Sequence, residues 1–178
     1  MIAAGQKAIL VIQGEFRVLS RPDEVLSTIL GSCVAACIWD EGMQLGGMNH
    51  FLLAQAQGDP AVRDNRYGVH AMEMLINGLL RAGARRDRLK AKLFGGAKIA
   101  ANLRDIGTSN ADFARGFLKT EGIPCLAESL GGTRARRVLF QPATGLARQL
   151  LIPNEAVDEK PQRTPPPGTA ASTGIELF

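Results

Sequence analysis

The sequence has few of the residues that build disulfide frameworks, metal sites and nucleic-acid surfaces. It contains three cysteines, two histidines and 5% aromatic residues. Three cysteines, an odd number without framework spacing, do not predict a disulfide scaffold. Cys33 and Cys37 are too few ligands for a zinc site, because no second cysteine or histidine pair follows them. The scarcity of aromatics and the lack of a known binding motif argue against nucleic acid as a partner.

Long apolar runs and targeting signals are also missing. No apolar run approaches the roughly 20 residues that span a bilayer. The first residues lack the basic start and the cleavage site of a signal peptide. We therefore expect a cytoplasmic protein without membrane insertion. With 178 residues, of which 46% are hydrophobic and 21% charged, the chain is long enough for one domain with a real core.

The net charge of +4 is modest, but the basic residues are unevenly distributed. They gather in two groups, Arg81, Arg85, Arg86, Arg88, Lys90 and Lys92, and Arg134, Arg136 and Arg137. Such groups predict either a solvated helix end and loop or a docking face for an acidic partner.

Hydrophobic periodicity predicts both strands and helices. Residues 34–39 and 44–53 are predicted to form a hairpin around the turn residues 40–43. Helical spacing starts at Tyr67 and stops at Gly83, and Ser109 or Asn110 is expected to cap a second helix. Residues 54–66 between these elements are predicted to be a loop, either a lid or docking element or a plain surface loop.

The composition changes at Pro153. Prolines then lie among threonine, serine, glycine and lysine, so the segment cannot bury enough apolar surface to offset the entropy of ordering it. We therefore divide the chain into a domain over residues 1–152 and a flexible C-terminal tail over residues 153–178.

The sequence places a cysteine after two small residues, Gly31 and Ser32. A thiol with an imidazole in reach is the minimum equipment for nucleophilic acyl chemistry. Cys33 and His50 are equidistant from a point between Glu41 and Gly42, inside the predicted turn. An antiparallel hairpin with that centre places the two side chains directly opposite each other on one face. A bulge at the glycine pair 46–47 would shift this register.

The other cysteines and the other histidine fit less well. Cys37 shares the face of Cys33, but the same register gives it Gly46 as a partner, which offers no base. Cys125 lies in an apolar strand and is predicted to be a small buried hydrophobe. His70 lies on the polar side of its helix, which predicts solvent exposure.

Two further roles remain to be filled. Backbone N–H groups at Gly31 and Ser32 are candidates for an oxyanion hole. A third side chain usually orients the base. Ser27 and Thr28 lie just upstream of the cysteine, and Asp40 and Asn49 are alternatives to them. The residues alone do not choose among these four.

Several segments resemble one known family in order and at consistent spacing. They are residues 30–35 (LGSCVA), 46–51 (GGMNHF), 67–72 (YGVHAM), 92–97 (KLFGGA) and 131–136 (GGTRAR). Together they resemble the CheD family of chemoreceptor glutamine deamidases, from about residue 14 to residue 152. The tail after Pro153 lies outside this resemblance.

The resemblance implies a fold, a reaction and residue roles. The fold would be an α/β sandwich related to deamidating toxins, in which a mixed or antiparallel sheet is flanked by helices. The chemistry would be papain-like, with Cys33 as nucleophile and His50 as base and without metal or cofactor. The family's third residue, usually a threonine six before the cysteine, falls on Ser27, although Thr28 lies next to it.

The implied substrates are methyl-accepting chemoreceptors, whose glutamines would become glutamates that a methyltransferase can esterify. The family also binds CheC-type phosphatases, which implies a second partner. Two alternatives stay open. Instead of a deamidase, the chain could be a non-catalytic module that regulates such a phosphatase, or an enzyme that hydrolyses receptor methyl esters with the same thiol.

Overall fold

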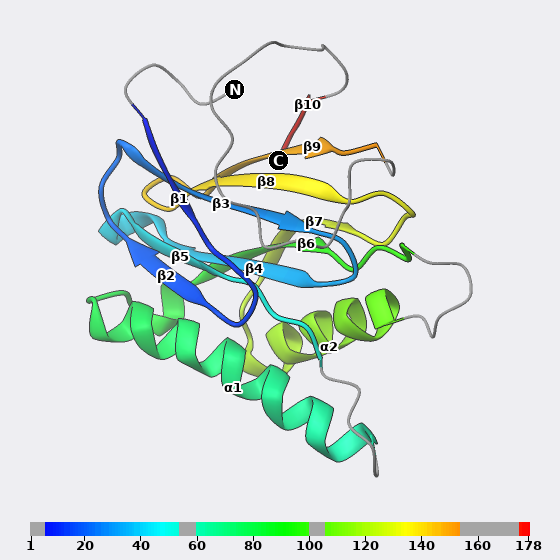
Figure 1. Cartoon of the computed structure of the whole chain (residues 1–178). Helices are drawn as coiled ribbons and strands as arrows, with labels where there is room; N and C mark the ends of the chain where they lie inside the picture. The colour runs from blue at the N-terminus through cyan, green and yellow to red at the C-terminus, as the bar shows by residue number, and fades with distance from the viewer. Residues whose placement is uncertain (1–5, 54–59, 100–105, 154–174) are drawn as a thin grey trace.

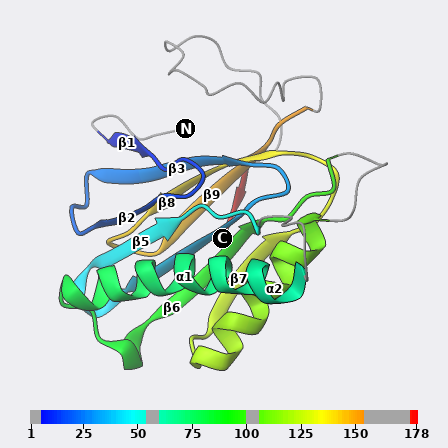
Figure 2. The same cartoon turned by 60° about the horizontal axis from the view of Figure 1, so that its bottom comes forward.

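The computed structural model describes residues 6–53, 60–99, 106–153 and 175–178, which form three layers (Figure 1). Two five-stranded sheets stack face to face, and two helices cover the outer face of the second sheet (Figure 2). Sheet A contains, in order, β1 (Lys7–Leu10), β3 (Glu24–Leu30), β8 (Arg136–Gln141), β9 (Leu146–Leu151) and β10 (Ile175–Leu177). Sheet B contains, in order, β2 (Phe16–Leu19), β5 (Leu45–Asn49), β4 (Val34–Asp40), β6 (Lys90–Gly95) and β7 (Cys125–Leu130).

Both sheets are mixed. The pairs β1–β3 and β6–β7 are parallel, whereas the other neighbouring strands run antiparallel. The predicted fold class, a layered α/β sandwich with flanking helices, is confirmed.

The alternation of side chains along β4 explains the layering. Val34, Ala36 and Ile38 pack toward the helices, whereas Ala35, Cys37 and Trp39 pack between the two sheets. Because both faces of the strand are covered, every residue of β4 is buried. Such a strand appears in the sequence as a continuous apolar run rather than as an alternating one.

Helix α1 (Pro60–Arg81) covers sheet B, and α2 (Ile106–Glu121) packs beside it (Figure 2). The predicted apolar stripe of α1 is buried in the core between helices and sheet, at Met72, Leu75, Ile76 and Leu79. Gly83, with φ of 106°, ends the helix, and its N–H bonds Leu80 O while Ala84 N–H bonds Leu79 O. The helix begins at Pro60, so the predicted loop over 54–66 is wrong for its second half. Residues 54–59 lie outside the described ranges.

The end of the chain adds a strand where the sequence predicts only a tail. Ile175–Leu177 pair with β9, and Phe178 N–H donates to Ala147 O at 3.2 Å. The Phe178 ring meets Phe94 edge to face, with 5.6 Å between ring centroids. Residues 154–174 of the predicted tail are outside the described part of the chain.

The hairpin β4–β5 forms as predicted, but its register differs. Asp40 pairs with Leu45, and the short 3-10 turn Glu41–Met43 between them ends at Gln44, whose φ is 50°. The hairpin is therefore centred between Gly42 and Met43. Near its open end, Val34 lies opposite Phe51. The predicted direct opposition of Cys33 and His50 is wrong by two residues.

A shift of two residues preserves the face on which each side chain lies. His50 is offset from Cys33 along the strand direction, and both lie on the face between the sheets. The glycine pair causes no bulge in this ladder. A side chain at Gly46 would meet the backbone of Pro142, and one at Gly47 would meet the carbonyl of Arg17. The glycines therefore allow close backbone approach.

Candidate active site

The Cys33 loop, residues 31–33, joins β3 to β4 and is fixed through its three carbonyl groups. Ala97 N bonds Gly31 O at 2.8 Å, Asn110 Nδ2 bonds Ser32 O at 2.7 Å, and Gly96 N bonds Cys33 O at 2.7 Å. Within the described ranges, the backbone hydrogen bonds use neither the N–H of Gly31 nor that of Ser32. These two N–H groups are the oxyanion donors that the sequence predicts.

Asn110 also fixes the chain on the other side of the site. Its Oδ1 accepts a hydrogen bond from Leu53 N at 2.8 Å, and the side chain is fully buried in α2. One side chain thus links the loop before Cys33 to the segment after His50. Ser109 and Asn110 both lie inside α2, so the expectation that one of them caps this helix is wrong.

His50 follows β5 and lies in a hydrogen-bonded chain. Thr28 Oγ1 donates to Val11 O at 2.7 Å, and the same oxygen lies 2.9 Å from His50 Nδ1. Because the hydroxyl proton points to Val11, the hydroxyl oxygen is left to accept, and Nδ1 must carry the ring proton. Nε2 then holds the free lone pair. It is buried, and no residue in the described ranges forms a hydrogen bond to it.

The structure places only one of the four candidate orienting residues beside His50. Thr28 shares the inner face of β3 with Leu26 and Leu30, whereas Ser27 lies on the opposite face. Asn49 Oδ1 accepts from Ala36 N at 2.9 Å on the helix-facing side of sheet B. Asp40 accepts from Met43 N and Arg85 N at the far end of the hairpin.

Gln13, which no motif of the sequence predicts, lies next to the thiol. Cys33 Sγ donates to Gln13 Oε1 at 3.5 Å, and Cys33 itself is half-buried. Gln13 belongs to the connection between β1 and β2. No local pattern marks it as functional, because the contact joins residues far apart in sequence.

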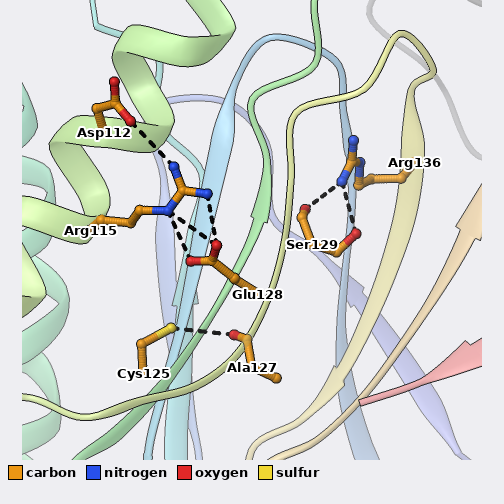
Figure 3. A network of polar contacts seen from close by, with 7 residues as sticks. All are labelled: Asp112, Arg115, Cys125, Ala127, Glu128, Ser129 and Arg136. Carbon is orange, nitrogen blue, oxygen red and sulfur yellow. Dashed lines mark hydrogen bonds and ion pairs between the residues drawn. The ribbon is translucent and has the colours of Figure 1, made fainter.

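The remaining cysteines are placed away from this constellation. Cys37 is fully buried, and burial raises the pKa of its thiol well above the ordinary value, which keeps it protonated. Cys125 is exposed on β7, where its thiol donates to Ala127 O at 3.3 Å (Figure 3). The prediction of a buried Cys125 is therefore wrong. The side chains packed around the sulfur still remove part of its water, and this partial desolvation, followed by the charge of Glu128, raises the pKa of the Cys125 thiol. His70 is exposed, as predicted.

Most of the basic residues of the predicted docking face form ion pairs or hydrogen bonds with other residues of the chain. Ion pairs join Arg85 to Asp87, Arg86 to Glu121, Arg88 to Asp40 and Lys90 to Glu41. Arg136 is buried and donates to Ser129 and to Gly131 O (Figure 3 shows the Ser129 contacts). These contacts favour a structural role for the two groups.

Burial of His50 predicts a pH dependence of stability. Burial lowers the pKa of His50 below its ordinary value of 6.5, and the hydrogen bond to Val11 only partly opposes this. The unfolded chain therefore binds a proton at a higher pH than the fold does, so His50 contributes stability above pH 6.5 that is lost as the pH falls through the lowered value. We expect Tm to drop as the pH falls below 6.5, and the drop to be smaller in His50→Gln. The exposed His70→Gln variant is the matched control and should keep the wild-type drop.

Fold and site together define a three-layer α/β protein with a cysteine, a histidine and a threonine at one end of its sheet interface. The family model described as "CheD chemotactic sensory transduction" matches residues 52–149. A "Probable chemoreceptor glutamine deamidase CheD 1" of Ruegeria sp. (strain TM1040) is 49% identical over 96% of this chain and 95% of its own. The chain belongs to the CheD family.

Other relatives agree over nearly their whole length. The proteins named "Probable chemoreceptor glutamine deamidase CheD" from Acidiphilium cryptum (strain JF-5) and Agrobacterium fabrum (strain C58 / ATCC 33970) are 53% and 48% identical. The matches cover 97% and 100% of this chain and 94% and 100% of theirs. Among solved structures, Neisseria meningitidis protein NMB0706 matches with a TM-score of 0.46 and 12% identity, over 72% of this chain and 63% of that one. Within the described residues, neither helix is long and apolar enough to cross a membrane.

Proposed function

We propose that the chain is a protein-glutamine deamidase that converts glutamine side chains of chemoreceptors to glutamate, with Cys33 as nucleophile and His50 as general base. Family membership and the names of the relatives support the reaction class. The observation that carries the residue roles is the hydrogen-bonded chain from Val11 through Thr28 to His50, because it leaves Nε2 as a buried acceptor for a proton.

The reaction follows from these groups. His50 Nε2 takes the thiol proton of Cys33, and the thiolate attacks the carboxamide carbon of the substrate. When the tetrahedral intermediate collapses, the C–N bond breaks and the imidazolium gives its proton to the departing ammonia. The neutral His50 then removes a proton from water, and the resulting hydroxide attacks the thioester carbon. The C–S bond breaks, the receptor leaves with a glutamate side chain, and His50 returns the proton to the Cys33 thiolate. Lowering of the His50 pKa by burial keeps the ring neutral, and so able to act as a base, near neutral pH.

The negative charge of the intermediate needs donors. The N–H groups of Gly31 and Ser32 supply them in this proposal, since the carbonyls of the same loop are hydrogen-bonded and hold the loop in place. Asn110 acts as a positioning residue, because it holds the loop that carries both donors and the nucleophile.

Incubation with receptor cytoplasmic fragments tests the proposal. Peptide mass spectrometry should find the mass gain that accompanies replacement of an amide NH2 by OH at specific glutamines. Methanol release from methylated receptors, without glutamine conversion, would instead identify a methylesterase. Binding to a CheC-type phosphatase without any turnover would identify a regulatory module. A product carboxylate would provide a site for a receptor methyltransferase and thus link the enzyme to adaptation.

A further inference from the structure

The connection between β1 and β2, residues 11–15, is built into the site. Val11 O accepts from Thr28 Oγ1, and Val11 N donates to Ser27 O at 2.8 Å. At its other end, Gly14 N donates to His50 O at 2.8 Å, and His50 N donates to Glu15 O at 3.0 Å. The segment is therefore hydrogen-bonded both to His50 and to Thr28, the residue whose hydroxyl contacts the His50 ring.

A tight turn at the centre of this segment presents Gln13. Glu15 N bonds Ile12 O at 3.0 Å, and Gly14 in the third position has φ of 85°, as a type II turn requires. Gln13 occupies the second position, and its side chain is exposed. Its carboxamide contacts Cys33 Sγ from the solvent side of the site, from which a receptor glutamine must arrive.

The contact cannot persist unchanged during the reaction. In the resting site the thiol donates to Gln13 Oε1. Once the proton has moved to His50, the thiolate is purely an acceptor and would face a carbonyl lone pair. The terminal torsion of glutamine has a broad, roughly two-fold profile, so a half turn brings Nε2–H toward the sulfur at low cost.

We propose that Gln13 is a catalytic residue: its carboxamide accepts from the Cys33 thiol at rest, then donates from Nε2 to the thiolate and to the oxygen of the tetrahedral intermediate. This inference rests on the proposed deamidase function. Gln13 transfers no atom, because the proton moves between Cys33, His50, ammonia and water as described above. The carboxamide adds a side-chain donor to the backbone donors of the loop 31–33.

The test compares Gln13→Ala and Gln13→Glu with Gln141→Ala. The Gln141 carboxamide is also hydrogen-bonded, since it donates to Pro22 O at 2.8 Å and accepts from Thr144 Oγ1 at 3.3 Å, but Gln141 lies on β8. We expect Gln13→Ala to lower kcat for receptor glutamines about 10- to 100-fold, toward the low end for a lost oxyanion donor because the side chain is exposed. KM and Tm should stay near wild type, and Gln141→Ala should leave kcat unchanged.

A second measurement needs no receptor. Alkylation of Cys33 by iodoacetamide at neutral pH, followed on the Cys33 peptide, reports the thiolate directly. Gln13→Glu places a carboxylate beside the sulfur, so we expect alkylation about tenfold slower, equivalent to roughly one unit of thiol pKa. Gln13→Ala should also be slower than wild type.

The outcomes separate the two hypotheses. If wild-type protein converts glutamines and Gln13→Ala does so equally fast, Gln13 is not catalytic. A lower KM or a faster rate in Gln13→Ala would show that Gln13 instead occupies the substrate position as a plug, which also overturns the inference. If wild-type protein converts no glutamine, the deamidase proposal fails, and the alkylation rates still decide whether Gln13 stabilises the thiolate.

Discussion

Replacing Cys33 with alanine is expected to abolish glutamine conversion on receptor fragments, by on the order of 10⁴-fold or more. In the proposed mechanism the substitution removes the atom that forms the thioester, and neither of the other two thiols is placed to replace it. Cys37 is buried between the sheets with a raised pKa, and Cys125 is exposed on a different strand from the site. The loss should appear in kcat measured by peptide mass spectrometry, while Tm changes little.

Cys125→Ala is the matched control for this experiment. It removes a thiol of the same chemistry, which donates to Ala127 O on β7, and should leave turnover intact. Full activity in Cys33→Ala together with a loss in Cys125→Ala would move the nucleophile to β7. Retained binding to receptor fragments by inactive Cys33→Ala would show that the loss is chemical.

The β4–β5 hairpin shows how far spacing alone leads. Turn residues located the break, and parity placed Cys33 and His50 on one face, which the observed register keeps. The exact centre could not be predicted, because the Glu41–Met43 turn and the left-handed Gln44 shift it by one position. Sequence spacing fixes which face a side chain takes more reliably than which residue it opposes.

Which of Ser27 and Thr28 lies beside His50 depends on the packing of β3 in one sheet against the end of β5 in the other. Spacing taken from the resemblance favoured Ser27, but the alternation of β3 directs Thr28 inward with Leu26 and Leu30. Leu26 and Leu30 are both apolar, and their fully buried positions mark the inner face. However, Val25, on the outer face, is also buried, so an apolar pattern alone would not have separated the two faces.

Gln13 and Asn110 were missed for a different reason. Each acts through hydrogen bonds to residues more than ten positions away, such as Asn110 to Ser32. Their own neighbourhoods look like an ordinary turn and an ordinary helix. The fold reveals both residues, because it brings the β1–β2 connection and α2 to the Cys33 loop. Asn110 is buried, so its amide needs hydrogen-bond partners, and it finds one in this loop.

Thr28→Val is expected to lower kcat on the order of a hundredfold or more, the range of a lost general base. Valine keeps the β-branched shape but removes the oxygen that accepts from Nδ1–H. The ring is then free to move its proton to Nε2, where it can no longer take the thiol proton. Val11 O lies 3.4 Å from Nδ1 and is the remaining acceptor, so a residual activity should persist. Val11 O also loses the Thr28 donor, which should cost roughly 1 kcal/mol or more of stability.

Two control variants show whether the loss in Thr28→Val is due to the missing hydroxyl of Thr28. Thr28→Ser keeps the hydroxyl and should recover most of the activity, since the freer rotamer costs little beside the chemical loss. Ser27→Ala removes the neighbouring hydroxyl from the opposite face of β3 and should leave kcat at the wild-type level. Should Ser27→Ala lose more turnover than Thr28→Val, the serine would be the residue that orients His50. A loss in Thr28→Ser without a loss in Thr28→Val would mean that the methyl group matters and the hydrogen bond does not. The hydrogen-bonded chain from Val11 to His50 predicts neither outcome, because it depends on the Thr28 oxygen alone.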